Sequence, residues 1–180
     1  MFKEKIAVFD LDDTLYVANS HIEILCQYYK TKIFKSLIFK VIGKLSCKIE
    51  RMLLYHFYNK IPENIKNAYL LKFNTTVLEL LQKKQKDGYF ILILSNAPIE
   101  LLIAAAEYLR VDYLQAKPFD KANALNAAYK YKSLFVCTDN TSDIDLLSIA
   151  DEAVITCKEK NKKYFIKNLV KKNYTFFGEK

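Results

Sequence analysis

Apolar and polar positions follow two alternating patterns along this chain. Short continuous apolar runs occur at 6–9, 89–94 and 134–137, and further short strands are expected at 111–114 and 153–156. Such runs are typical of strands that are buried on both faces of a parallel sheet. Between them the spacing is helical, over 75–87, from Pro98 onward, over 121–131, from Asp139 through Leu147, and near the C-terminus. This alternation predicts an α/β fold, a Rossmann-like, mainly parallel sheet flanked by helices.

One segment is too long for a simple crossover between two strands. From about 20 to 73 the spacing is helical, with a break at Pro62 because proline ends or kinks a helix. We therefore expect a helical cap inserted over 18–74, with 1–17 and 75–180 forming the core.

Within the expected cap, two helix faces differ in character. Seven apolar residues share one face at 100° per residue: Phe34, Ile38, Val41, Ile42, Leu45, Ile49 and Met52. Four basic residues share the opposite face: Lys40, Lys44, Lys48 and Arg51. We expect the apolar face to pack and the basic face to be solvated. Two alternatives for the basic face are attraction of an anionic substrate and peripheral contact with an anionic membrane.

The net charge of +8 is unevenly distributed. Residues 30–60 carry eight basic side chains and one acidic one, and residues 156–180 carry eight lysines and two glutamates. The remainder is acidic, and an acidic middle between two basic segments suits an anionic ligand held beside a metal ion. No nucleic-acid binding motif accompanies the charge, so nucleic acid is not an expected partner.

The cysteines show neither CxxC pairing nor nearby histidines: Cys26, Cys47, Cys137 and Cys157. We expect buried thiols in a reducing compartment rather than a zinc site. The first residues do not resemble a signal peptide, and no apolar run approaches the ~20 residues that span a bilayer. The expected location is the cytoplasm.

A cluster of carboxylates directly follows the first apolar run, where the sequence reads DLDDT from Asp10 to Thr14. Because side chains alternate along a strand, Asp10 and Asp12 can point the same way at its end. Like charges so close repel one another unless a cation neutralises them. Mg²⁺, a hard cation that prefers oxygen ligands, is the simplest candidate.

Three further polar clusters lie after later predicted strands or at the start of a predicted helix: Ser95/Asn96, Lys117/Lys121 and Asp139/Asp143. Ligands of open parallel sheets bind outside the carboxyl ends of the strands. With these four clusters in this order along the chain, the sequence resembles the haloacid dehalogenase superfamily. DLDDT matches its first motif, the serine of ILILSN its second, a lysine before a helix its third, and TDNTSD its fourth. The resemblance covers the chain outside the expected cap.

This resemblance implies a role for each matched residue. Asp10 would be the nucleophile, and Asp12 would be the general acid and then the general base. Mg²⁺ would be held by Asp10, the backbone carbonyl of Asp12 and Asp139, with Asp143 as a supporting carboxylate. The phosphate of the substrate would be bound by Thr14, Ser95, Asn96 and a lysine.

Two lysines are candidates for that position. Lys121 starts a helix, and its distance before Asp139 is similar to that in the phosphoserine-phosphatase-like branch of the superfamily. Lys117 is the alternative, because Pro118 keeps the backbone extended there.

Bidentate capture of a substrate carboxylate favours arginine, and Arg51 is the arginine of the expected cap.

The resemblance therefore implies a Mg²⁺-dependent phosphatase that hydrolyses a small phosphomonoester through an aspartyl-phosphate intermediate. Asp12 favours phosphate chemistry, because a dehalogenase needs only the nucleophile. One alternative is a phosphomutase of the same superfamily. Another is a membrane- or partner-binding protein with a vestigial site.

Overall fold

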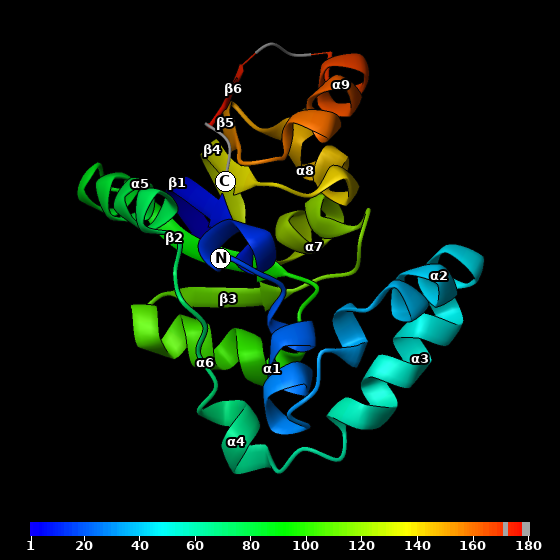
Figure 1. Ribbon diagram of the computed structural model, residues 1–180. Coiled ribbons are helices and arrows are strands. Elements are labelled where there is room, and N and C mark those ends of the chain that lie inside the picture. Colours follow the sequence, from blue (N-terminus) through cyan, green and yellow to red (C-terminus); the bar gives the residue numbers. More distant parts are fainter. Residues whose placement is uncertain (171–172, 178–180) are drawn as a thin grey trace.

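One parallel sheet forms the centre of the computed structural model, which describes residues 1–170 and 173–177 apart from the side chains of Lys40 and Cys47. Its strands are β1 (Phe2–Phe9), β2 (Phe90–Ser95), β3 (Asp112–Gln115), β4 (Lys130–Thr138), β5 (Glu152–Ile155) and β6 (Tyr174–Phe176). They are ordered β3–β2–β1–β4–β5–β6, and every neighbouring pair is parallel (Figure 1). The predicted Rossmann-like α/β fold is confirmed.

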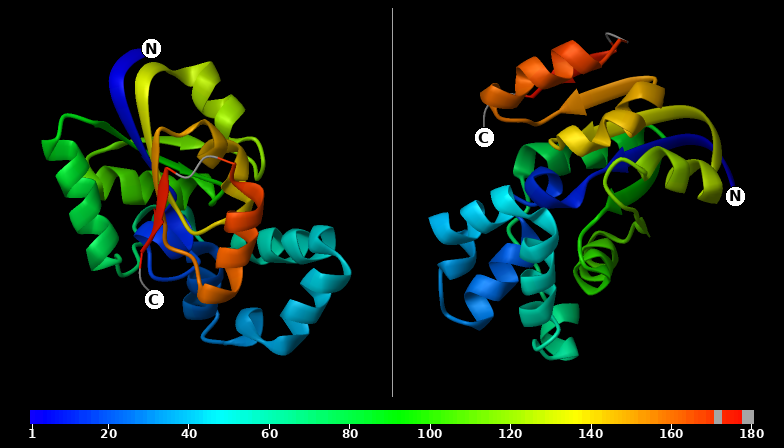
Figure 2. Two further views of the ribbon diagram at one scale, coloured as in Figure 1. Left: turned by 90° about the horizontal axis from the view of Figure 1, so that it is seen from above. Right: turned by 90° about the vertical axis from the view of Figure 1, so that its right-hand side faces the viewer.

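Helices cover both faces of this sheet (Figures 1 and 2). They are α5 (Thr75–Lys86) and α6 (Ile99–Leu109) on one face, and α7 (Lys121–Ala128), α8 (Ile144–Ile149) and α9 (Glu159–Asn168) on the other. The side chains of β1 alternate between the two cores: Ala7 and Phe9 pack toward α5 and α6, and Ile6 and Val8 pack toward α7, α8 and α9. Burial on both faces explains why this strand is continuously apolar.

The central position of β1 determines where the polar clusters meet. Phe9 pairs with Ile93 of β2 on one side and with Cys137 of β4 on the other. Because the three strands are parallel, their carboxyl ends lie at the same edge of the sheet. The residues that follow them are therefore brought together, although they are far apart in the sequence.

A helical segment leaves the sheet after β1 and returns before α5 (Figure 1). It contains α1 (Ser20–Tyr28), a 3₁₀ turn (Ile33–Lys35), α2 (Leu37–Leu45), α3 (Cys47–Tyr58) and α4 (Glu63–Asn67). Its apolar cluster includes Phe34, Phe39, Leu54 and Tyr58, and Leu101 of α6 belongs to the same cluster. The contact with Leu101 attaches the segment to the rest of the chain. Pro62 caps α4, at the expected break.

The expectation of one packed apolar face through 34–52 is wrong. Ser46 adopts extended backbone (φ −156°, ψ 102°), which ends α2, and its side chain accepts a hydrogen bond from Ile49 N to start α3. After this break the cluster is built from other positions. Ile38 is 66% exposed and Leu45 is 82% exposed, whereas Phe34 of the predicted face is buried.

Two other differences concern short elements. The helix expected over 121–131 ends at Ala128, because Lys130 and Tyr131 already pair with β1. The strand β6 was not expected, although its Tyr-Thr-Phe sequence consists of strand-favouring residues. The helix near the C-terminus is present as α9, and part of the expected basic tail, at 171–172 and 178–180, lies outside the described residues.

The described cysteines, Cys26, Cys137 and Cys157, are buried thiols. The prediction of a buried thiol for Cys47 lies outside the described side chains. Across 1–170 and 173–177, none of the helices has both the length and the apolar character needed to cross a bilayer.

Candidate active site

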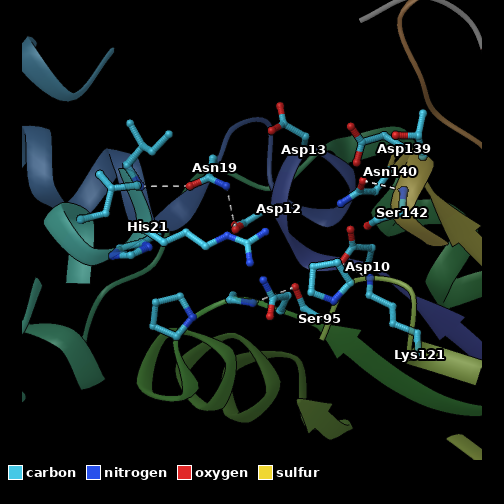
Figure 3. A pocket seen from close by; sticks show the side chains of 18 of the residues that line it. Asp10, Asp12, Asp13, Asn19, His21, Ser95, Lys121, Asp139, Asn140 and Ser142 are labelled. Carbon is cyan, nitrogen blue, oxygen red and sulfur yellow. Dashed lines mark hydrogen bonds and ion pairs between the residues drawn. The ribbon is translucent and has the colours of Figure 1, made fainter. Parts of the chain in front are cut away.

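A cavity of about 470 Å³ lies at the carboxyl ends of β1, β2 and β4. Residues that follow these strands form one part of its wall, and residues of α1 and α3 form another (Figure 3). Six residues of the predicted site line this cavity: Asp10, Asp12, Ser95, Asn96, Lys121 and Asp139. The structure thus brings together residues from all four sequence clusters.

Asp10 and Lys121 form a buried ion pair at the base of this cavity. The Lys121 Nζ atom lies 3.0 Å from Asp10 Oδ1 and 2.7 Å from Asp143 Oδ2. Burial lowers the pKa of Lys121, but the charges of Asp10 and Asp143 outweigh this effect and the pKa is raised. Leu11 N also donates to Asp10 Oδ1, at 2.9 Å. Both contacts of the carboxylate with described residues involve Oδ1, so Asp10 Oδ2 is the atom left for a ligand in the cavity.

Asp12 is held by the start of α1. Its Oδ1 accepts a hydrogen bond from Ser20 N at 2.8 Å, and its Oδ2 accepts one from Asn19 Nδ2 at 3.2 Å. Burial raises the pKa of Asp12 to about 7, against the lowering effect of the hydrogen bonds from Ser20, and the charges of Asp10 and Asp13 raise it further. This carboxyl can therefore exchange a proton near neutral pH.

The turn after β1 explains how neighbouring aspartates reach one cavity. Asp13 has a left-handed backbone (φ 56°, ψ 4°), which non-glycine residues seldom adopt. Asp10, Asp12 and Asp13 all line the cavity (Figure 3). In this tight turn Leu15 N and Tyr16 N donate to the carbonyl oxygens of Asp10 and Leu11, so the three aspartates stay together at the end of β1.

Thr14 is placed differently from the expectation that it binds phosphate. Its buried hydroxyl donates to Asp139 Oδ1 and accepts from Asp139 N, both at 3.0 Å. It does not belong to the cavity wall among the described residues. Thr14 is therefore positioned to orient Asp139 rather than to contact a ligand.

Asp143 lies behind Lys121, outside the described wall of the cavity. Its carboxylate accepts hydrogen bonds from Lys121 and from the hydroxyl groups of Thr138 and Ser142. Burial raises the pKa of Asp143 and the charge of Asp10 raises it further, whereas the charge of Lys121 lowers it. This position suits a residue that supports Lys121 and the loop after β4.

The C-terminal end of β2 and the residue after it contribute polar groups to the cavity wall. Ser95 is buried, and its hydroxyl accepts a hydrogen bond from Ala97 N at 3.3 Å, which leaves its proton for another acceptor. The neighbouring Asn96 is exposed and also lines the cavity. A hydroxyl and an amide at this position can bind oxygens of an anion.

The two candidate lysines occupy different environments. Lys121 is 2% exposed and contacts two carboxylates, whereas Lys117 is exposed and is not part of the described cavity wall. The structure therefore places Lys121, and not Lys117, beside the predicted nucleophile.

Several lining residues were not assigned a site role from the sequence: Asn19, His21, Glu50, Tyr55 and Asn161. Asn19 also caps α1, since its side chain accepts from Ile22 N at 3.0 Å. An asparagine before a helix could be recognised in the sequence as the N-cap residue of that helix, but nothing in the sequence indicated its contact with Asp12. The other four come from α1, α3 and α9, and only the packing of those helices reveals them.

The oxygen donors of the cavity fit a divalent cation that keeps part of its water. Asp10 and Asp139 both line it. Among the described residues, no three His, Cys, Asp or Glu side chains gather closely enough to hold a metal ion. An ion here would need the backbone carbonyl of Asp12 and water to complete its coordination, and Mg²⁺ is the ion that commonly binds in this way.

Comparison with known proteins identifies the fold but no sequence relative. The chain matches no model of a known protein family and no curated protein sequence. Its fold is similar to that of solved phosphoserine phosphatases, which confirms the expected resemblance at the level of the fold.

Three solved structures illustrate this likeness. A phospho-aspartyl intermediate analogue of phosphoserine phosphatase aligns with a TM-score of 0.64 and 14% identity, over 93% of this chain and 92% of that one. A substrate-bound phosphoserine phosphatase complex aligns at 0.62 and 15%, over 93% and 99%. A phosphoserine phosphohydrolase-like protein from Francisella tularensis aligns at 0.59 and 17%, over 95% and 94%.

Proposed function

We propose that this chain is a Mg²⁺-dependent phosphatase that hydrolyses a small phosphomonoester through an aspartyl-phosphate on Asp10. The observation that carries the proposal is the shared cavity of Asp10, Asp12 and Ser95, with Lys121 Nζ 3.0 Å from the Asp10 carboxylate. A similar fold has been solved as a phospho-aspartyl intermediate analogue, which supports the same chemistry here. The helical segment, over 18–74, would be the cap that closes the site.

In the first step Asp10 Oδ2 would attack the phosphorus atom of the ester. A bond forms between this oxygen and phosphorus, and the bond from phosphorus to the ester oxygen breaks. Asp12 would donate its proton to the departing oxygen, so the alcohol leaves neutral. Lys121, Ser95 and the Asn96 side chain would offset the negative charge that the phosphoryl oxygens carry in the transition state.

In the second step water would attack the phosphorus atom of the aspartyl-phosphate. Asp12, now ionised, would take a proton from this water. The bond between phosphorus and Asp10 breaks, which releases inorganic phosphate and restores both carboxyl groups to their starting forms. Throughout both steps Thr14 would keep Asp139 oriented, and Asp143 would keep Lys121 against Asp10.

Bound Mg²⁺ would supply positive charge that neutralises the phosphoryl oxygens and the aspartates together. Asp10, the Asp12 carbonyl and Asp139 would hold it. Removal of divalent ions with EDTA should abolish turnover, and added Mg²⁺ should restore it. Activity that survives EDTA would contradict the proposed cofactor.

The cap side of the cavity would contact the organic part of the substrate. Glu50 and Arg51 of α3 line this side, together with Leu54 and Tyr55. A guanidinium group there favours a substrate with a second anionic group. Arg51→Met should raise KM for such substrates with little change in kcat, and Arg110→Met, at the C-terminus of α6, is the matched control.

The nucleophile is tested with Asp10→Asn and a generic aryl phosphate as substrate. Turnover should fall by at least about 10³-fold, because the amide oxygen is a poor nucleophile, and the wild-type enzyme should incorporate phosphate at Asp10. Retained activity in Asp10→Asn would show that Asp10 is not the nucleophile. Release of an isomeric phosphate rather than inorganic phosphate from a metabolite panel would identify a phosphomutase instead.

A further inference from the structure

Helices α2 and α3 carry an exposed apolar surface. It consists of Leu37, Ile38, Val41, Leu45, Ile49 and Met52, and we call it the α2–α3 surface. In all three views α2 lies at the periphery of the molecule, with no other helix or strand outside it (Figures 1 and 2). These side chains are therefore available to a partner.

The exposed apolar residues of α2 form a regular stripe on a different side of the helix from the residues that pack within the protein. Leu37, Val41 and Leu45 recur every four residues and form one stripe along the helix. On another side of α2, Phe39 is buried against Phe34. Gly43 lies against the Glu50 carboxylate of α3, so a side chain at this position would displace Glu50. The helix thus uses Phe39 and Gly43 for packing within the protein and directs a second apolar stripe outward.

The charges on and near α2 and α3 are mainly positive. Exposed basic residues lie on both helices and on the preceding turn: Lys30, Lys32, Lys35, Lys44, Lys48 and Arg51. Of these, Lys35 pairs with Glu23 of α1 and Arg51 lines the cavity. Between residues 30 and 60 the acidic side chain is Glu50, which is half-buried beside Gly43 and lines the cavity. A partner that covers this surface must therefore offer both apolar groups and negative charge.

A second copy of the chain does not meet this requirement. In a twofold symmetric pair the same surface would face itself, which places Lys44 and Lys48 of one copy near those of the other. The apolar contact would then be opposed by like charges. An interface of anionic phospholipids offers both acyl chains and negative headgroups, and basic helices with an apolar face bind there.

We propose that the α2–α3 surface docks on a lipid bilayer that contains anionic phospholipid. The apolar stripe would enter the boundary between headgroups and acyl chains, and the lysines would lie among the anionic headgroups. The helices would lie on the bilayer without crossing it. This proposal does not depend on the proposed phosphatase activity, because none of the six residues lines the cavity.

The test is cosedimentation of the full chain with vesicles. The wild-type chain should bind vesicles of phosphatidylcholine with about a quarter phosphatidylglycerol, and binding should weaken as salt rises. Vesicles of phosphatidylcholine alone should bind at least about tenfold less. Ile38→Glu and Leu45→Glu should each lower the bound fraction by about tenfold, since each removes apolar contact and adds negative charge. Turnover of an aryl phosphate by both variants should match the wild type.

Ile166→Glu is the matched control, because Ile166 is 59% exposed and lies on α9, another lysine-rich helix. It should bind vesicles like the wild type. The proposal is overturned if neither vesicle binds the chain, if binding is independent of phosphatidylglycerol, or if Ile166→Glu weakens binding as much as Leu45→Glu. It is also overturned if sedimentation shows a wild-type dimer that Leu45→Glu dissociates. Circular dichroism of each variant checks that it is folded.

Discussion

Thr14 and Asp139 are 125 positions apart in the sequence, yet two hydrogen bonds join them directly. The Thr14 hydroxyl donates to the Asp139 carboxylate and accepts from the Asp139 backbone amide, both at 3.0 Å. One side chain thus fixes both the backbone and the carboxylate of a residue on the loop after β4. The turn after β1 and this loop are therefore connected as one unit.

Thr14→Val should loosen that connection while keeping the volume of the side chain. Loss of the two hydrogen bonds should lower the free energy of unfolding by about 1–2 kcal/mol, because the partly buried amide and carboxylate of Asp139 each lose a partner. The Mg²⁺ concentration needed for half-maximal turnover should rise. Urea unfolding and Mg²⁺ titration of activity measure the two effects. Thr76→Val, at an exposed position on α5, should change neither.

Lys121→Met should affect stability and turnover together. Without the ammonium group, Asp10 and Asp143 remain as buried neighbouring carboxylates, at a cost of about 3–5 kcal/mol in unfolding free energy. Turnover should fall by at least about 10²-fold, because the charge beside the nucleophile is lost. Lys117→Met is the control and should retain wild-type stability and turnover. Equal losses in both variants would contradict the assignment of Lys121.

His21 should make the protein less stable in acid. Burial lowers the pKa of His21 to about 4, although the Leu54 backbone and the charge of Glu100 raise it. Its ring packs between Tyr55 and Tyr58. Below pH 6.5 the unfolded chain takes up a proton at His21 that the folded chain does not, so stability falls between about pH 6.5 and 4. The loss reaches roughly 3 kcal/mol by pH 4 and grows no further below it.

His21→Phe should remove this part of the pH dependence. Denaturant unfolding of the wild type and the variant across pH 4–7 measures it as the difference between the two stability curves, since the carboxyl groups contribute equally to both. For His56→Phe, at an exposed position on α3, the free energy of unfolding should change with pH as it does in the wild type. Parallel curves for the wild type and His21→Phe would show that His21 is not the origin.

Glu100→Gln should weaken the attachment of the helical segment to α6. The Glu100 carboxylate accepts a hydrogen bond from the Tyr58 hydroxyl at 3.2 Å and lies 3.5 Å from Lys66 Nζ. Lys66 is buried, with its ammonium group 4.7 Å from the Tyr58 ring centre. Removing the charge should cost about 1–3 kcal/mol and increase amide exchange in α3 and α4. Glu107→Gln, exposed on the same helix, is the control and should change neither.

The sequence predicted those parts of the fold that depend on local patterns. Continuous apolar runs located the buried strands, and the polar residues at their ends located the cavity. Asp10 and Asp139 could be predicted together because parallel strands end at one edge of the sheet. By contrast, the contact of Asn19 with Asp12 depends on how α1 starts, and nothing in the spacing of the two residues indicates it.

The helical segment was harder to predict, because helical periodicity does not say which of two apolar faces is buried. Residues 34–52 fit one continuous helix, and the serine that interrupts it is tolerated within helices as well as at their starts. Ser46 decides the outcome through its extended backbone, which redirects α3 so that Leu54 and Tyr58 enter the cluster. The apolar face that was expected to be buried is left outside.

The central position of β1 also has a consequence for how the chain is made. It pairs with β2 on one side, but its partner on the other side, β4, begins at Lys130, so one edge of β1 stays unpaired until most of the protein has been synthesised. The contacts within α1–α4 are local and can form early, whereas the sheet requires long loop closures, which slow folding. Asp10 therefore meets Asp139 only late in folding, and a chain that stops before β4 leaves one edge of its central strand unpaired and prone to aggregation.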